Sequence, residues 1–485
     1  MPQPGETYRN KWYVMTAVSV GVFLATIDSS IVNIALPTIT KTFNAEFATV
    51  QWIVLAYLLT ITTLMLSIGR LSDIIGKKLI YAWGFVIFLI GSALCGLSWS
   101  IEALIGFRVL QAIGASMIIS LGMAIVTEAF PPSERGKALG ISGAVVSLGI
   151  VLGPTLGGIL IDALSWHWIF FVNLPIGIIG LYMVLRYVPA IKPEEHQRFD
   201  FLGAAVLFLS LFSLLLALTL SQNLSFSHWL VIALFIIALV STITFILIEL
   251  RSNNPMLDLR LFHDIQFSTG LFTGLITFIA IAGTTFLMPF YLENVLHYTA
   301  RQIGLLLAVV PVVLVILSPL SGYLSDRYGT RRITVIGLFL LLIGYAALTT
   351  LSINTSASGF ILRFLFVGLG MGVFQSPNNS AIMGAASKDK LGVVSGVLAI
   401  TRSLGQTTGI ALLGSIWAGI VMSMGGDLIY GSVTEAPPHI QVVALQGTFM
   451  IVVILISIGL IVGIWAWLKE YKQATLSKLT TLKND

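Results

Sequence analysis

Long apolar runs follow one another along nearly the whole chain, and short polar or charged segments separate them. A helix that crosses a bilayer needs about 20 consecutive, mostly apolar residues, and each run has about that length. The pattern therefore predicts an all-α integral membrane protein with fourteen spanning helices. They are expected at residues 12–36, 49–68, 79–98, 103–127, 136–160, 167–188, 201–221, 228–249, 267–291, 302–324, 332–351, 359–384, 391–421 and 446–468.

The composition agrees with lipid as the solvent of most of the surface. Of the 485 residues, 57% are hydrophobic and only 10% are charged, whereas a soluble protein carries about 25% charged residues. The net charge of +5 comes from short loops rather than from one basic patch, which argues against nucleic acid as a partner. The single cysteine, Cys95, can form no intramolecular disulfide. The first apolar run is too long for a cleavable signal peptide and leads directly into the bundle.

The distribution of Lys and Arg indicates how the chain is oriented, because basic residues accumulate in the cytoplasmic loops of membrane proteins. With a cytoplasmic N-terminus, 21 of the 26 Lys and Arg residues fall in cytoplasmic segments. Only Lys41 and Arg301 then fall in outer loops, and Arg108, Arg363 and Arg402 fall inside spans. With an even number of spans, we predict that both termini are cytoplasmic.

A charged pattern at the end of a long apolar run occurs twice, at Gly69–Lys78 and at Gly322–Arg332, with an offset of 253 residues. We call these two segments the loop islands. Two further pairs keep nearly the same offset: Arg108 with Arg363 at 255, and Gly149 with Gly405 at 256. Three matches in the same order indicate an internal duplication.

The duplication defines the predicted domain organisation. One six-helix bundle covers residues 12–188, a second covers 267–468, and two inserted helices at 201–249 have no counterpart in either half. Two related halves with one site between them are the plan of a secondary transporter.

Four segments resemble the major facilitator superfamily: the first loop island, the glycine run from Gly149 to Gly158 in span 5, Leu24–Pro37 in span 1, and Ser165–Gly177 at the start of span 6. The glycine run is similar to the antiporter motif of that superfamily. The last two segments are typical of its fourteen-span drug:proton antiporter family. This resemblance implies proton-driven efflux of a hydrophobic, often cationic compound across the bacterial cytoplasmic (inner) membrane.

The sequence departs from the family pattern at two places. Ile74 stands in the first loop island where the family usually has Arg, as Arg327 does in the second island. Ile410 stands in span 13 where span 5 has Pro154, so the antiporter-type Gly-Pro pair is confined to the first half.

Asp28 is the only carboxylate well inside a span, and Arg108 lies at a similar depth, roughly 12 and 8 Å from the outer ends of spans 1 and 4 at about 1.5 Å per residue. Charges inside a bilayer are costly and are functional candidates. We predict that the two side chains pair and that Asp28 binds the coupling proton, tuned by Arg108. The alternative is a static ion pair. The matching stretch 280–285 contains no acid, which favours a single proton site.

Polar and charged residues in apolar helices are candidates for a substrate cavity, because such groups need partners or water. They are Asn33 in span 1, Gln375, Asn378, Asn379 and Arg363 in span 12, and Arg402 in span 13. Hydrogen bonding between helices is the alternative for the asparagines and Gln375, and a contact that locks helices together is the alternative for Arg363. A permanently charged Arg402 near the cavity would disfavour a dicationic substrate.

A mechanical role is predicted for two groups of residues. In the loop islands they are Gly69, Asp73, Gly76, Lys77, Gly322, Asp326 and Arg327. In span 5 they are Gly149, Gly153, Pro154 and Gly157, where small residues allow helices to approach closely and proline bends the helix. We expect both groups to act as gates, with topology signals as the alternative for the loop islands.

The leading hypothesis is a proton-coupled antiporter that works as a monomer by alternating access and that needs the lipid bilayer, protons and a small hydrophobic substrate. No enzyme site, nucleotide-driven engine or metal-binding cluster is expected, so the proton gradient would supply the energy without a cofactor. The alternatives are an exporter of lipids or fatty acids, with an envelope partner protein, and a non-transporting membrane sensor or scaffold.

Overall fold

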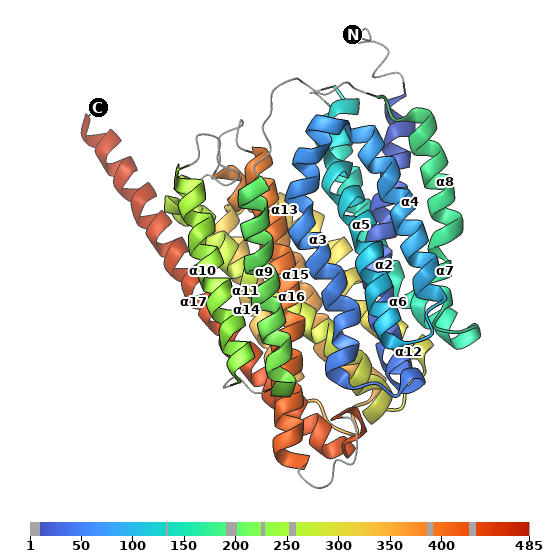
Figure 1. Ribbon diagram of the computed structural model, residues 1–485. Coiled ribbons are helices and arrows are strands. Elements are labelled where there is room, and N and C mark those ends of the chain that lie inside the picture. The colour runs from blue at the N-terminus through green and yellow to red at the C-terminus, as the bar shows by residue number, and fades with distance from the viewer. Residues whose placement is uncertain are drawn as a thin grey trace. The chain divides into compact units, whose positions relative to one another are not determined.

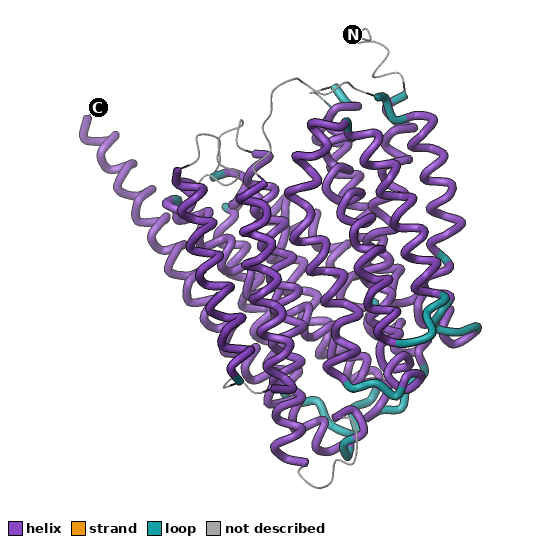
Figure 2. Tube along the Cα trace, in the orientation of Figure 1, coloured by secondary structure: helices purple, strands orange, loops and turns teal. Residues whose placement is uncertain are grey.

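The computed structural model describes residues 10–131, 134–190, 201–224, 228–251, 259–385, 391–425 and 433–484. Every regular element in these ranges is a helix (Figure 2). Thirteen helices in the described part are long and apolar enough to cross a membrane. The predicted all-α membrane fold is therefore confirmed.

The helices are α2 (Lys11–Phe43), α3 (Phe47–Ile75), α4 (Lys77–Gly96), α5 (Ile101–Ala129), α6 (Arg135–Ala163), α7 (Trp168–Phe171), α8 (Asn173–Tyr187), α9 (Phe201–Leu224), α10 (Trp229–Arg251), α11 (Ile265–Phe290), α12 (Ala300–Leu307), α13 (Val309–Tyr328), α14 (Thr330–Leu348), α15 (Ala357–Gly384), α16 (Leu391–Gly425) and α17 (Pro438–Asn484) (Figure 1). Short 3-10 helices at Leu259–His263 and Val433–Glu435 and a π-helix at Tyr291–Val295 complete the described elements.

Two predicted spans are each divided into two helices, and proline explains both divisions. The span predicted at 167–188 consists of α7 and α8, with Pro175 in the first turn of α8. The span predicted at 302–324 consists of α12 and α13, with Pro311 in the first turn of α13. Proline has no backbone N–H to donate to the preceding turn, so it fits the first turn of a helix better than the interior.

The chain divides into two compact units. Unit 1 comprises Met1–Ile248, Thr285–Ala308 and Ile410–Gln441, and unit 2 comprises Glu249–Thr284, Val309–Gly409 and Val442–Asp485. The predicted division into two six-helix bundles and an inserted pair stays a prediction.

In unit 1, α2 packs against α5, α6 and α8 (Figure 1). Its contact with α6 runs along the predicted glycine seam. A methyl group added to Gly149 would collide with Thr26, and one added to Gly153 would collide with Ser30. Ser30 Oγ also donates a hydrogen bond of 3.2 Å to the carbonyl oxygen of Gly149. The seam therefore brings the two helix backbones together, as the sequence predicts.

Unit 1 also contains contacts around the end of α2, which we call the Asn44 end. Lys41 on α2 forms an ion pair of 2.6 Å with Glu293 in the π-helix. The ring of Phe47 lies 5.1 Å from that of Phe290 and 4.9 Å from that of Trp417. These rings pack elements of the first and second sequence halves against each other within the same unit.

At the second seam of unit 1, α12 packs on α6. An added methyl group on Gly304 would collide with the carbonyl group of Pro154, and one on Gly158 would collide with the backbone of Ala300. The Gly-Pro pair of the first half therefore lies directly against a helix of the second half.

The two loop islands share one backbone feature. Gly76 joins α3 to α4 with φ = 109°, and Gly329 joins α13 to α14 with φ = 92°. Only glycine adopts such angles at little cost, which supports the internal repeat. Lys77 forms an ion pair with Glu128 on α5.

Other residues of the loop islands stand as follows. Asp326 and Arg327 are exposed, and Gly69 and Gly322 lie within α3 and α13. The side chain of Asp73 lies outside the described part. Their predicted role in gating stays a prediction.

The inserted helices α9 and α10 contact each other through hydroxyl groups, with 2.6 Å between Ser210 Oγ and Thr242 Oγ1. Helix α9 packs against α3. Helix α10 exposes many large apolar side chains, including Ile236 and Leu239, which suits a surface in contact with lipid.

The glycine seam yields a stability prediction. Gly153→Ala should lower the free energy of unfolding of the purified protein by about 1–3 kcal/mol, since overpacking a tight contact has that cost. Gly143→Ala on the same helix is the matched control, because a methyl group there meets nothing within 4 Å. Thermal unfolding in detergent measures both, and equal midpoints for the two variants would contradict the close seam.

Candidate functional site

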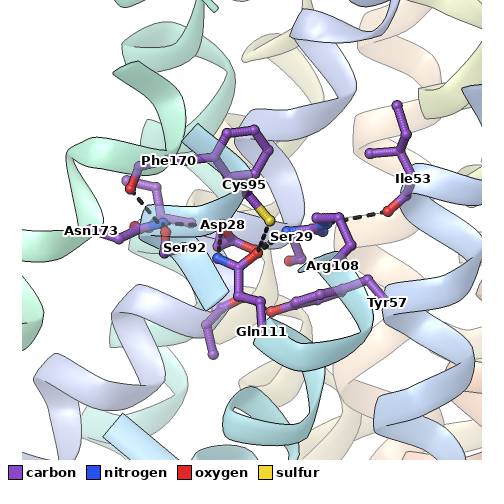
Figure 3. Close-up of polar contacts among 12 residues, drawn as sticks. Asp28, Ser29, Ile53, Tyr57, Ser92, Cys95, Arg108, Gln111, Phe170 and Asn173 are labelled. Atoms are coloured by element: carbon purple, nitrogen blue, oxygen red, sulfur yellow. Dashed lines mark hydrogen bonds and ion pairs between the residues drawn. The ribbon is translucent and has the colours of Figure 1, made fainter. Parts of the chain in front are cut away.

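The candidate site is built around Asp28, whose side chain is fully buried in unit 1. Its carboxylate accepts hydrogen bonds from three side chains (Figure 3). Arg108 Nη1 donates to Oδ2 at 2.6 Å, and Gln111 Nε2 and Asn173 Nδ2 donate to Oδ1 at 2.8 and 3.0 Å. The donors come from α5 and α8, so the charged carboxylate joins these helices to α2.

Arg108 pairs with Asp28 as the sequence predicts, and it is also fully buried. Its Nε donates to the carbonyl oxygen of Ile53 at 3.2 Å, and its Nη1 also donates to Gln111 Oε1 at 2.7 Å. The guanidinium carbon lies 3.9 Å from the ring centroid of Tyr57. A cation over an aromatic face is stabilised by the ring quadrupole, so α3 supports the charge as well.

A second layer of polar groups surrounds the carboxylate. Asn173 Nδ2 also donates to Ser92 Oγ at 3.0 Å, and Ser92 Oγ donates to the carbonyl oxygen of Phe170 at 2.9 Å. The thiol of Cys95 lies 3.7 Å from Gln111 Oε1. Asp28 is thereby connected to α4 and α7 as well as to its direct donors.

Sequence reasoning missed Gln111, Asn173 and Ser92. Gln111 stands three residues after Arg108 on α5, and residues at this spacing share one face of a helix, so it could have been proposed from spacing. Asn173 lies in the segment Ser165–Gly177, whose only signal in the sequence is its resemblance to a family pattern. Amides and hydroxyls are common in spanning helices, so nothing distinguishes Ser92 before the fold is known.

The three donors satisfy the hydrogen-bonding needs of the buried Asp28 carboxylate, and a proton on Asp28 would change those needs. A buried carboxylate needs opposite charge and hydrogen-bond donors, and Arg108, Gln111 and Asn173 supply them. Protonation would remove the charge that Arg108 neutralises, and at least one donor would have to turn away or be replaced by an acceptor. A proton at this site therefore changes contacts on several helices at once.

The candidate cavity residues lie partly in helix contacts. In unit 2, Asn378 Nδ2 donates to the carbonyl oxygen of Gly270 at 3.0 Å, which joins α15 to α11. Arg363 donates to Thr350 Oγ1 at 2.8 Å and to the carbonyl oxygen of Gly359 at 2.9 Å. Asn378 therefore joins two helices, whereas Arg363 contacts its own helix and the turn that follows α14. A cavity role for both residues stays a prediction.

The other cavity candidates are half-buried: Asn33, Gln375, Asn379 and Arg402. Asn33 Nδ2 donates to the carbonyl oxygen of Ser29 at 3.4 Å. The guanidinium of Arg402 lies 5.5 Å from the ring centroid of Phe278 within unit 2. A substrate-binding role for this group stays a prediction. In the described part of the chain, no group of three or more His, Cys, Asp or Glu side chains is placed to hold a metal ion.

Comparison with known families gives one clear match: the sequence model described as "Major Facilitator Superfamily" matches residues 18–410. The riboflavin transporter RibZ of Clostridioides difficile (strain 630) is 34% identical over 465 residues, which cover 96% of this chain and 99% of that protein. The multidrug transporter protein MdtP of Bacillus subtilis (strain 168) is 31% identical, and the match covers 83% of this chain and 74% of that protein.

Two solved structures show the same fold at low sequence identity. A POT family transporter in complex with 5-aminolevulinic acid matches with a TM-score of 0.68 at 16% identity, covering 93% of this chain and 96% of that chain. A bacterial homologue of the human lysosomal transporter Spinster, in an inward-facing and unoccupied conformation, matches with a TM-score of 0.67 at 17% identity. This match covers 94% of this chain and 97% of that chain.

The buried pair yields a second stability prediction. Arg108→Met should destabilise the protein by about 3–5 kcal/mol, since it leaves a buried carboxylate without its cation. The double variant Asp28→Asn/Arg108→Met should recover a large part of this loss, because no unpaired charge remains. Thermal unfolding in detergent checks both, and a double variant less stable than Arg108→Met would show that the two charges are not coupled.

Proposed function

Because the chain belongs to the Major Facilitator Superfamily, we propose that it is a proton-coupled antiporter that exports hydrophobic organic compounds, cationic ones among them. The chain is a multi-pass membrane transporter and not an enzyme. In this proposal it lies in a bacterial cytoplasmic membrane with both termini in the cytoplasm, so that the Asn44 end faces outward. The energy source is the proton gradient, and the protein acts as a monomer without a cofactor.

The observation that carries the proposal is the buried Asp28 in α2, whose carboxylate accepts hydrogen bonds from three side chains. Asp28 binds a proton from outside and releases it to the cytoplasm, and substrate moves in the opposite direction. Arg108 keeps its charge throughout, so its partner changes when Asp28 becomes neutral. The proton thereby alters the contacts of α2 with α5 and α8, and these changes bias which end of the transporter opens.

The contacts at the Asn44 end fit a closed outer gate. Phe47, Phe290 and Trp417 pack together there, and α6 meets α12 at Gly158 and Gly304. The exposed Lys41–Glu293 pair adds little, because surface ion pairs contribute about 0–1 kcal/mol. Apolar packing and close helix contact therefore contribute most of the stability of the closed outer gate. Pro154 lies at the point where α6 must separate from α12 when the gate opens.

The test of this proposal is Asp28→Asn in proteoliposomes with an imposed pH gradient. The variant should insert and exchange substrate across the membrane without a gradient, but it should lose uphill transport driven by protons. Glu102→Gln is the control, since Glu102 is an exposed carboxylate at the start of α5. Uphill transport by Asp28→Asn at the wild-type level would exclude Asp28 as the coupling site.

A second candidate substrate class is riboflavin and similar flat, polar heterocycles. It is favoured by the match with the riboflavin transporter RibZ, which extends over 99% of that protein, whereas the match with the multidrug transporter MdtP covers 74% of MdtP. A bulky polar heterocycle would need amide or hydroxyl partners in the cavity, and Gln375 and Asn379 are candidates for that role.

A substrate panel separates the two classes. Proteoliposomes are loaded with a cationic dye, and unlabelled riboflavin, neutral antibiotics and fatty acids are added as competitors. If the chain is a drug exporter, cationic and neutral drugs should reduce dye transport far more effectively than riboflavin does at equal concentration. Inhibition by riboflavin alone would favour the flavin class, and inhibition by fatty acids alone would favour the lipid-exporting alternative.

A further inference from the structure

The amide of Asn173 has an unusual combination of contacts. Its nitrogen Nδ2 donates to both Asp28 Oδ1 and Ser92 Oγ at 3.0 Å. Its oxygen Oδ1 is buried and finds no hydrogen-bond donor among the described residues. The amide nitrogen thus uses both of its hydrogens, whereas the amide oxygen accepts none. A buried acceptor without a donor is unfavourable.

We propose that Asn173 is a positioning residue whose amide turns over when Asp28 takes up a proton, and that this turn passes the protonation state of Asp28 to Ser92 and α7. The inference rests on the proposed role of Asp28 as the proton site. It adds a residue and a direction of signal that the pair of Asp28 and Arg108 does not provide.

The two protonation states of Asp28 demand opposite hydrogen-bond roles from their neighbour. A carboxylate accepts only, and a carboxylic acid must also donate its proton. With Nδ2 toward Asp28, Asn173 serves the carboxylate. A half-turn of the amide brings Oδ1 to the same position, where it accepts the O–H of the acid. The amide nitrogen and oxygen are nearly equal in size, so the turn needs no additional space.

The turn changes Ser92 as well. In the observed state Ser92 accepts from Nδ2 and donates to the carbonyl oxygen of Phe170 at 2.9 Å. With Oδ1 facing Ser92, its hydroxyl donates to Asn173 and releases Phe170. Each orientation leaves one amide atom without a partner, and the turned state also gives up the bond from Ser92 to Phe170. The observed orientation is therefore favoured with the carboxylate, and the O–H of the protonated Asp28, which needs an acceptor, is what selects the turned one.

The location of Asn173 suits this role. It is the first residue of α8, directly after the break that separates α7 from α8. Ser92 belongs to α4 and Phe170 to α7 (Figure 3). Protonation of Asp28 would therefore loosen the bond between α4 and α7 next to the α7–α8 break.

Apart from Asn173, the groups around Asp28 offer few acceptors for the O–H of its protonated form. The ionisable neighbours are Arg108 on α5, Tyr57 on α3 and Cys95 on α4, and the charged residues of α6 and α8 stand in the first or last turns of these helices. Gln111 Oε1 already receives Arg108 and the Cys95 thiol. Tyr57 donates a long hydrogen bond of 3.5 Å to the carbonyl oxygen of Ala25. Its hydroxyl is therefore the competing acceptor for the proton of Asp28, and the experiment must separate its effect from that of Asn173.

The first test is infrared difference spectroscopy of the purified protein between alkaline and acidic pH. The carbonyl band of protonated Asp28 is identified by its absence in Asp28→Asn. We compare Asn173→Thr with Asn173→Val, which have the same shape, but only Thr keeps a hydroxyl that can both donate and accept. The band should stay near the wild-type position in Asn173→Thr and move to higher wavenumber in Asn173→Val, where the acid loses its acceptor.

An unmoved band in Asn173→Val, or a band moved by Tyr57→Phe instead, would overturn the inference. His167 is half-buried beside α7, and His167→Gln controls for its contribution to the spectra. The absence of any Asp28-dependent acid band at every pH at which the protein stays folded would contradict both the switch and the proposed coupling.

The second test is transport. Relative to its own exchange without a gradient, Asn173→Val should lose roughly tenfold in proton-driven accumulation, the equivalent of one hydrogen bond, and Asn173→Thr should retain most of it. Equal accumulation by the two variants would contradict the switch. Because the spectroscopic test needs no gradient, failure of the switch there is distinguishable from failure of the proposed antiport in Asp28→Asn.

Discussion

The ion pair between Asp28 and Arg108 is the interaction on which the rest of the site depends. Both side chains are fully buried, and either charge alone in that position would cost about 3–5 kcal/mol. The polar groups in contact with them serve one or both of the two charges, and Gln111 serves both. Gln111 and Asn173 complete the hydrogen bonding of the carboxylate, and Tyr57 covers the guanidinium. The pair therefore explains why amides and hydroxyls gather at one place in an otherwise apolar set of helices.

Close backbone packing is the second constraint, and it positions the pair. Helix α2 carries Asp28 and lies against α6 along Gly149 and Gly153, where a methyl group would collide with its neighbour. The same α6 meets α12 at Pro154, so a shift of α2 relative to α6 also affects the contact between α6 and α12. Small residues make these contacts tight without apolar side chains between them, and such surfaces can separate and re-form.

The spanning helices and the Asp28–Arg108 pair could be predicted from the sequence, for identifiable physical reasons. Lipid requires long apolar helices, so the spans follow from the pattern. Charges are so rare in the spans that Asp28 and Arg108 could be paired by depth alone.

The divisions of two spans, by contrast, depend on Pro175 and Pro311, which a search for apolar length passes over. The contacts of the amides could not be predicted either, because an amide in a spanning helix suits a cavity and a helix contact equally well. Asn378 is a cavity candidate in the sequence but joins α15 to α11.

The central claim is that Asp28 carries the coupling proton, and proton release from the purified protein tests it most directly. Substrate is added to the detergent-solubilised transporter in weakly buffered solution, and the released protons are counted with a pH indicator. We expect release from the wild type and none from Asp28→Asn at substrate concentrations that saturate both. Equal release from the two proteins would contradict the claim.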